Sequence, residues 1–136
     1  MLLYVTVGTD DLPRAVAFYD AVFAALGHPR LPEWTPGWAG WGKDYDAGIG
    51  FWLCPPFDGR PASGGNGTMF SFRAESAAQV RAFHAAGLAN GGTDDGPPGL
   101  RPHYDPAFYA AYLRDPTGNK ICAVWHRYNP AEEGED

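Results

Sequence analysis

Two cysteines and four histidines are the side chains of this chain best suited to nucleophilic, acid–base or metal chemistry. Cys54 and Cys122 lack the paired spacing of a zinc site and are too few for a disulfide framework, so we expect two reduced thiols. Cys122 could act as a nucleophile if a cation or a helix N-terminus favoured its thiolate, and Lys120 is the cation on the same strand face. In an apolar, aromatic pocket the same thiol would be buried and inert.

His103 is the histidine that we carry forward as a catalytic candidate. It lies in the segment HYDPAFY, beside Tyr104, Phe108 and Tyr109, in a loop that could fold over a cleft. General acid–base catalysis requires partners within hydrogen-bond reach, and an isolated histidine in a proline-rich loop is more often structural. We expect the other three histidines to be solvated or satisfied locally: His28, His84 and His126.

A predicted hairpin positions Cys122. Residues 109–114 and 120–125 are rich in aromatic, β-branched or other apolar side chains, and Asp115-Pro116-Thr117-Gly118 between them has the chemistry of a tight turn. Alternation along the second strand then places Ile121, Ala123 and Trp125 on one face, and Lys120, Cys122, Val124 and His126 on the other. We expect function on the second of these faces.

The rest of the chain predicts two helices and several short strands. Alternating or apolar runs indicate strands over 2–8, 47–54 and 68–73, and helical spacing with capping residues indicates helices over 11–26 and 76–90. Two short strands fit 28–43, and at most one strand fits 93–106, around 100–104. For the tryptophans of 28–43 we favour core or dimer packing over ligand stacking: Trp34, Trp38 and Trp41.

The two halves of the chain repeat. Aligning Val5 with Phe70 also matches Phe18 with Phe83, which predicts two β-α-β-β-β units. The expected fold is α+β: one domain over 1–136, in which two paired modules, 1–56 and 67–128, form curved sheets around a cleft. Residues 57–66 would connect the modules, and 129–136 would be a flexible acidic tail. One unit alone leaves a sheet face bare, so the modules must pair within the chain or across a dimer.

The chain resembles the vicinal oxygen chelate superfamily, which contains glyoxalases, bleomycin-resistance proteins and extradiol dioxygenases. The resemblance rests on a strand, the run DPTGN at 115–119 and a second strand, together with Tyr4-Val5-Thr6-Val7 followed by DLPRA at 11–15 and Phe18-Tyr19. It spans the whole chain. It implies the two-module fold with a shared cleft, and it implies four cleft positions that hold a metal in the family.

Those four metal positions correspond by resemblance to Tyr4, Trp52, Met69 and Cys122. A divalent metal needs at least three strong N, O or S donors. Trp52 cannot ligate, Met69 is a soft ligand, and Tyr4 would need its phenol ionised. The resemblance to the family therefore comes without its metal ligands, and we expect neither a divalent metal nor another cofactor.

Composition restricts the partners. Hydrophobic residues at 45% and aromatic residues at 15% fit a globular domain, whereas a net charge of −6 without a Lys/Arg cluster argues against nucleic acid and anionic membranes. No apolar run approaches the ~20 residues of a membrane span, and the N-terminus is unlike a signal peptide, so we expect a cytoplasmic protein. Small molecules and protein partners remain, and the Trp-rich segment with an apolar edge favours a homodimer.

Three functions stay open. We favour a metal-free protein that binds a small aromatic or apolar molecule, similar to the bleomycin-resistance branch. The alternatives are a lyase, isomerase or dioxygenase-like enzyme that uses Tyr4, His103 or Cys122, and a structural or regulatory dimer without a ligand. The residues predicted to contact a ligand are Tyr4, Thr6, Trp52, Met69, Ser71, His103, Tyr109 and Cys122.

Overall fold

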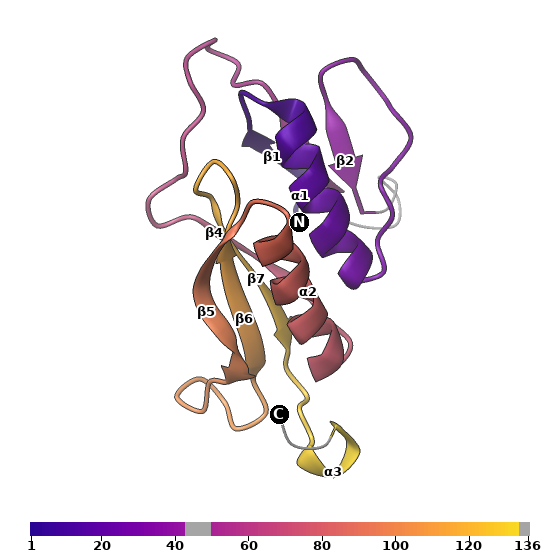
Figure 1. Cartoon of the computed structure of the whole chain (residues 1–136), viewed down its shortest axis with the longest axis vertical. Helices are drawn as coiled ribbons and strands as arrows, with labels where there is room; N and C mark the ends of the chain where they lie inside the picture. The colour runs from indigo at the N-terminus through magenta and orange to yellow at the C-terminus, as the bar shows by residue number, and fades with distance from the viewer. Residues whose placement is uncertain (43–49, 134–136) are drawn as a thin grey trace.

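A computed structural model describes residues 1–42 and 50–133 and contains two mixed sheets, each covered on one face by a helix (Figure 1). The strand order is β1 (Tyr4–Gly8), β3 (Gly50–Cys54), β2 (Ala39–Trp41) in the first sheet and β4 (Met69–Arg73), β7 (Lys120–Trp125), β6 (Tyr109–Arg114), β5 (Thr93–Leu100) in the second. The first and last strands of each module run parallel to each other, and the remaining pairs are antiparallel. The predicted α+β class is confirmed. The helices are α1 (Leu12–Ala25), α2 (Ala77–Ala89) and α3 (Pro130–Glu133).

The first module has fewer strands than the repeat predicts. Of the two short strands expected over 28–43, β2 is present, and the other is reduced to an isolated bridge between Arg30 and Trp41. Three prolines in this segment remove backbone donors that a longer ladder would need. The strand expected over 47–54 is β3, and residues 47–49 lie outside the described part of the chain.

The second module follows the prediction except at β5. The hairpin strands β6 and β7 have the predicted bounds, and α2 ends before Gly91 as expected. The strand that we expected around 100–104 lies earlier in the chain, over Thr93–Leu100. Pro97 and Pro98 are tolerated there because β5 is an edge strand with two register shifts against β6. Residues 101–104 form a turn, closed by the Tyr104 N–H donating to the Arg101 carbonyl at 2.9 Å.

One apolar core joins both modules within the chain. The helices α1 and α2 pack against each other, with α1 over the first sheet and α2 beside β7 of the second (Figure 1). Phe51 on β3 has its ring centroid 5.6 Å from that of Phe72 on β4, and Phe23 of α1 lies 4.9 Å from the same ring. The modules therefore pack together through their helix-covered faces, which leaves the opposite face of each sheet outside this core.

The segment expected to be a flexible acidic tail contains α3. Glu133 at its end accepts hydrogen bonds from the Ala77 backbone N–H and from Trp125 Nε1, both at 2.7 Å. The first of these places a carboxylate at the N-terminus of α2, where the helix dipole favours negative charge. Residues 134–136 lie outside the described part of the chain. Within the described residues, the helices are all too short or too polar to cross a bilayer.

Candidate functional site

A groove of about 670 Å³ lies on the face of the second sheet that points away from α2. Strand alternation creates it, because Leu113, Ile121 and Ala123 point into the core while their neighbours point outward. The loop that precedes β6 contributes two aromatic rings at one end. The lining residues are Gly67, Thr68, Met69, Ser71, Tyr104, Phe108, Tyr112, Arg114, Lys120, Cys122 and Val124.

Sheet register arranges the groove residues in rows across three strands. Ser71 on β4 pairs with Cys122 on β7, which pairs in turn with Tyr112 on β6. One row nearer the hairpin turn, Lys120 lies between Met69 and Arg114. The groove floor therefore carries a thiol, a hydroxyl and a phenol in one row, and two cations in the next.

Cys122 sits at the centre of the floor with only 1% of its surface exposed. Burial raises the pKa of its thiol, although a hydrogen bond with Ser71 and the charge of Lys120 act in the opposite direction. The thiol is therefore protonated at neutral pH, and its environment is that of a packed cysteine rather than an activated nucleophile.

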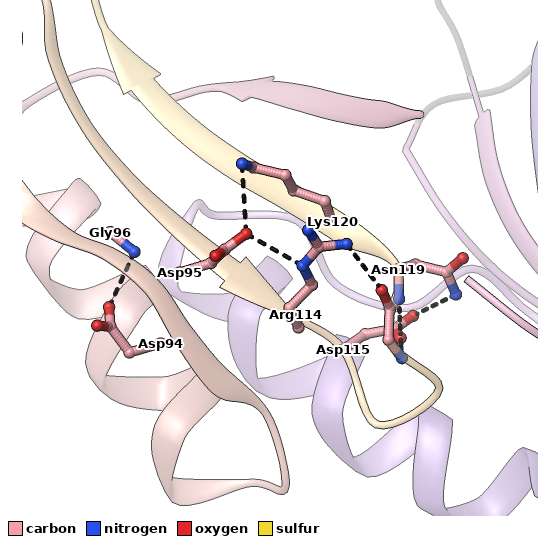
Figure 2. A network of polar contacts seen from close by, with 8 residues as sticks. Asp94, Asp95, Gly96, Arg114, Asp115, Asn119 and Lys120 are labelled. Carbon is pink, nitrogen blue, oxygen red and sulfur yellow. Dashed lines mark hydrogen bonds and ion pairs between the residues drawn. The ribbon is translucent and has the colours of Figure 1, made fainter. Parts of the chain in front are cut away.

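Arg114 and Lys120 share one carboxylate at the end of the groove near the hairpin turn (Figure 2). Asp95 Oδ2 lies 3.0 Å from Arg114 Nε and 3.3 Å from Lys120 Nζ. Lys120 Nζ is also 5.3 Å from the centre of the Tyr112 ring, a cation–π distance. This is the most strongly polar part of the groove.

Sequence reasoning missed Tyr112 and Arg114 as groove residues. A signal was available, because the predicted hairpin turn fixes Tyr112 opposite Cys122 and Arg114 opposite Lys120. No sequence pattern indicated Asp95, because its ion pairs are with residues of two other strands, Arg114 and Lys120.

The corresponding face of the first sheet is partly filled by tryptophan. Trp52 is 9% exposed, and its ring lies over Gly40, where an added Cβ would be 2.3 Å from the indole. Trp34 packs edge-on against it, with ring centroids 6.0 Å apart. Of the tryptophans for which we favoured packing, Trp41 is fully buried in the core, whereas Trp34 is 66% exposed. A separate groove of about 590 Å³ beside it is lined by Thr6 and Cys54, among others.

The four positions carried over from the resemblance fall on two sheets. None of them belongs to the helix-covered core, as the alternation predicted. Met69 and Cys122 line the second-sheet groove, whereas Tyr4 and Trp52 belong to β1 and β3 of the first sheet. The single cleft expected from the repeat is thus divided within this chain. Tyr4 and Met69 both remain open, with 44% and 43% of their surface exposed.

These four side chains do not fit a divalent metal. An indole has no lone pair for a metal, and the thiol of Cys122 would have to ionise against its raised pKa. In residues 1–42 and 50–133, no three His, Cys, Asp or Glu side chains cluster closely enough to hold an ion.

Two other predicted site residues lie outside the groove. Tyr109 was expected to contact the ligand, but it is 1% exposed in the core, where its ring stacks on Tyr128 and its hydroxyl lies 3.4 Å from Arg81 Nη1. The cause is register: Tyr109 pairs with Trp125, which belongs to the helix-covered face. His103 is exposed, and its ring packs at a tilt against that of Tyr104. The rings of Tyr104 and Phe108 line the groove.

Comparison with known proteins identifies the class of this fold. The family model described as "Glyoxalase/Bleomycin resistance protein/Dioxygenase superfamily" matches residues 1–123 of this chain. The chain belongs to this superfamily, as the sequence resemblance indicated. A search of curated proteins gave no match.

Solved structures agree with this assignment. A glyoxalase/bleomycin resistance protein from Albidiferax ferrireducens T118 is 42% identical, with a TM-score of 0.79 over 91% of this chain and 97% of that one. A glyoxalase-related enzyme from Fulvimarina pelagi (19% identity, TM-score 0.70, 96% and 88% covered) shares the fold. So does a glyoxalase/bleomycin resistance protein/dioxygenase family enzyme from Burkholderia phytofirmans PsJN (20% identity, TM-score 0.69, 90% and 95% covered).

Proposed function

We propose that this protein binds a small aromatic or apolar molecule in the second-sheet groove, without a metal. The observation that carries the proposal is the groove itself. It has a volume of about 670 Å³ and presents the rings of Tyr104, Phe108 and Tyr112 with a small number of polar groups. Small-molecule sites have this size and this composition.

The properties of the candidate nucleophile support binding over catalysis. Burial raises the pKa of Cys122, so its thiolate is disfavoured at neutral pH. His103 lies on the exposed surface of its loop rather than among the groove residues. An enzyme built on these two residues would need a conformation in which both change their surroundings.

We further propose that the protein forms a homodimer that covers the open sheet faces. Both β1 and β4 are edge strands, and apolar side chains on and just before them are well exposed: Leu2, Leu3, Tyr4 and Met69. Edge strands with exposed apolar side chains favour association, and two-fold dimers are the commonest oligomers. Light scattering at increasing concentration should give twice the chain mass of 14.7 kDa. A monomer throughout contradicts this part of the proposal.

Ligand binding can be tested with N-phenyl-1-naphthylamine, an uncharged aromatic dye that fluoresces in apolar sites. We expect saturable binding that weakens roughly tenfold in Phe108→Ala, because the variant removes an aromatic wall of the groove, worth about 1 to 1.5 kcal/mol.

Phe57→Ala is the matched control, because Phe57 is fully exposed and lines the separate groove beside the first sheet. Its affinity should equal that of the unmodified protein. Absence of saturable binding, or a loss in Phe57→Ala with none in Phe108→Ala, contradicts the proposal.

A further inference from the structure

The second-sheet groove has a charge opposite to that of the whole protein. The chain carries a net charge of −6. The groove lining nevertheless includes Arg114 and Lys120, and its other lining residues are all uncharged. A cationic site in an acidic protein favours anionic ligands over neutral or cationic ones.

Asp95 neutralises only one of these two cations. Both contact the same atom, Oδ2 of Asp95, and the three side chains are between 31% and 41% exposed. The groove end therefore retains one positive charge within reach of solvent. Arg114 is also fixed in place, because its Nη1 donates to the Gly118 carbonyl of the hairpin turn at 3.2 Å.

The groove is polar at one end and apolar at the other. The two cations share the row of the first residue of β7, where Lys120 pairs with Arg114. Val124, near the far end of β7, lines the groove together with the rings of Tyr104 and Phe108 from the loop before β6. At about 3.3 Å per residue, Lys120 and Val124 are separated by about 13 Å. That length suits a molecule with two or three rings.

We propose that the ligand of this groove carries an oxyanion, such as a carboxylate or sulfonate, which binds between Arg114 and Lys120. Its aromatic or apolar body then extends along β7 toward Phe108. This inference rests on the proposed binding function and adds the class of ligand. Arg114 and Lys120 can supply charge-assisted hydrogen bonds to an oxyanion. Asp95 occupies that position in the free protein and competes with the ligand.

A matched pair of dyes tests the anion site. 8-Anilinonaphthalene-1-sulfonate has the same rings as N-phenyl-1-naphthylamine and adds one sulfonate. We expect the sulfonate dye to bind about tenfold more tightly, as charge-assisted hydrogen bonds imply. Arg114→Gln and Lys120→Gln should each remove most of that difference, and any change in the affinity for the uncharged dye should be much smaller than the change for the sulfonate dye. Arg14→Gln, an exposed arginine on α1, should change neither affinity.

Asp95→Asn should change the affinity for the sulfonate dye in the opposite direction. Removing the competing carboxylate should strengthen binding of the sulfonate dye several-fold without changing the affinity for the uncharged dye. A purely structural role for Asp95 predicts equal weakening of both. If the uncharged dye binds in a Phe108-dependent manner and the sulfonate dye binds no more tightly, the anion site is refuted and the proposed function stands. If neither dye binds, the proposed function itself fails.

Discussion

Replacing Asp115 with alanine is expected to lower the free energy of unfolding by about 3 to 5 kcal/mol, more than any other single change to a polar side chain that we anticipate. Asp115 is 6% exposed, yet its carboxylate accepts five hydrogen bonds. Oδ1 accepts from the backbone N–H groups of Thr117, Gly118 and Asn119, each at 2.9 Å. The variant would leave these donors without that acceptor.

The other carboxylate oxygen of Asp115 links the two modules. Tyr19, on α1 of the first module, donates its hydroxyl to Oδ2 at 2.7 Å, and Asn119 Nδ2 donates to the same atom at 2.9 Å. Burial, together with the nearby Asp115 charge, raises the pKa of Tyr19 well above its ordinary value. The phenol therefore stays protonated and continues to donate. Tyr19→Phe removes this one bond, so we expect a smaller loss, of about 1 to 2 kcal/mol.

Urea unfolding followed by circular dichroism measures the effect of Asp115→Ala. Asp58→Ala is the matched control, because Asp58 Oδ1 accepts from the Arg60 N–H at 2.9 Å in an exposed turn of the connection. Its cost should stay below about 1 kcal/mol, since water can replace an exposed acceptor. Equal costs in the two variants would show that burial of Asp115 contributes nothing.

Phe18→Ala is expected to cost about 3 to 5 kcal/mol by opening a cavity between the helices. Phe18 is fully buried on α1, and its ring reaches the backbone of the α2 end. An added Cβ would lie 2.4 Å from Phe18 Cε2 at Gly92 and 3.3 Å from it at Gly87. Because glycine has no side chain, neither position can fill the space that the ring leaves.

Chemical denaturation of Phe18→Ala should give a lower midpoint with an unchanged slope. Phe57→Ala deletes the same ring at a fully exposed position and should stay within about 0.5 kcal/mol of the unmodified protein. A loss below 1 kcal/mol in Phe18→Ala would contradict the close helix contact on which the joint core depends.

Local signals were enough to predict most of the fold. The hairpin has the predicted strand bounds because Asp115 and Gly118 specify the turn, with Gly118 at a φ of 103°. Both helices begin directly after a capping residue, Asp11 for α1 and Ser76 for α2. The strand β5 was placed too late because Gly96, Pro97 and Pro98 read as a loop, and only pairing with β6 makes that segment a strand.

The candidate site was predicted less completely, because it depends on relations between strands. Alternation within β4 and β7 was sufficient to place Met69, Ser71 and Cys122 in one groove. Tyr109 was misplaced although the hairpin register that sets Tyr112 opposite Cys122 also sets Tyr109 opposite Trp125, on the helix-covered face. Trp34 packs against Trp52 on the outer face of the first sheet, and no local sequence pattern indicates this tertiary contact.

The most direct test of the central claim is a titration of ¹⁵N-labelled protein with N-phenyl-1-naphthylamine, followed by amide chemical shifts. We predict that the largest changes occur over β4, β6 and β7 and in residues 104–108, which together form the second-sheet groove. Changes confined to the first sheet and the connection at 55–63, or no saturable change at all, would contradict the account.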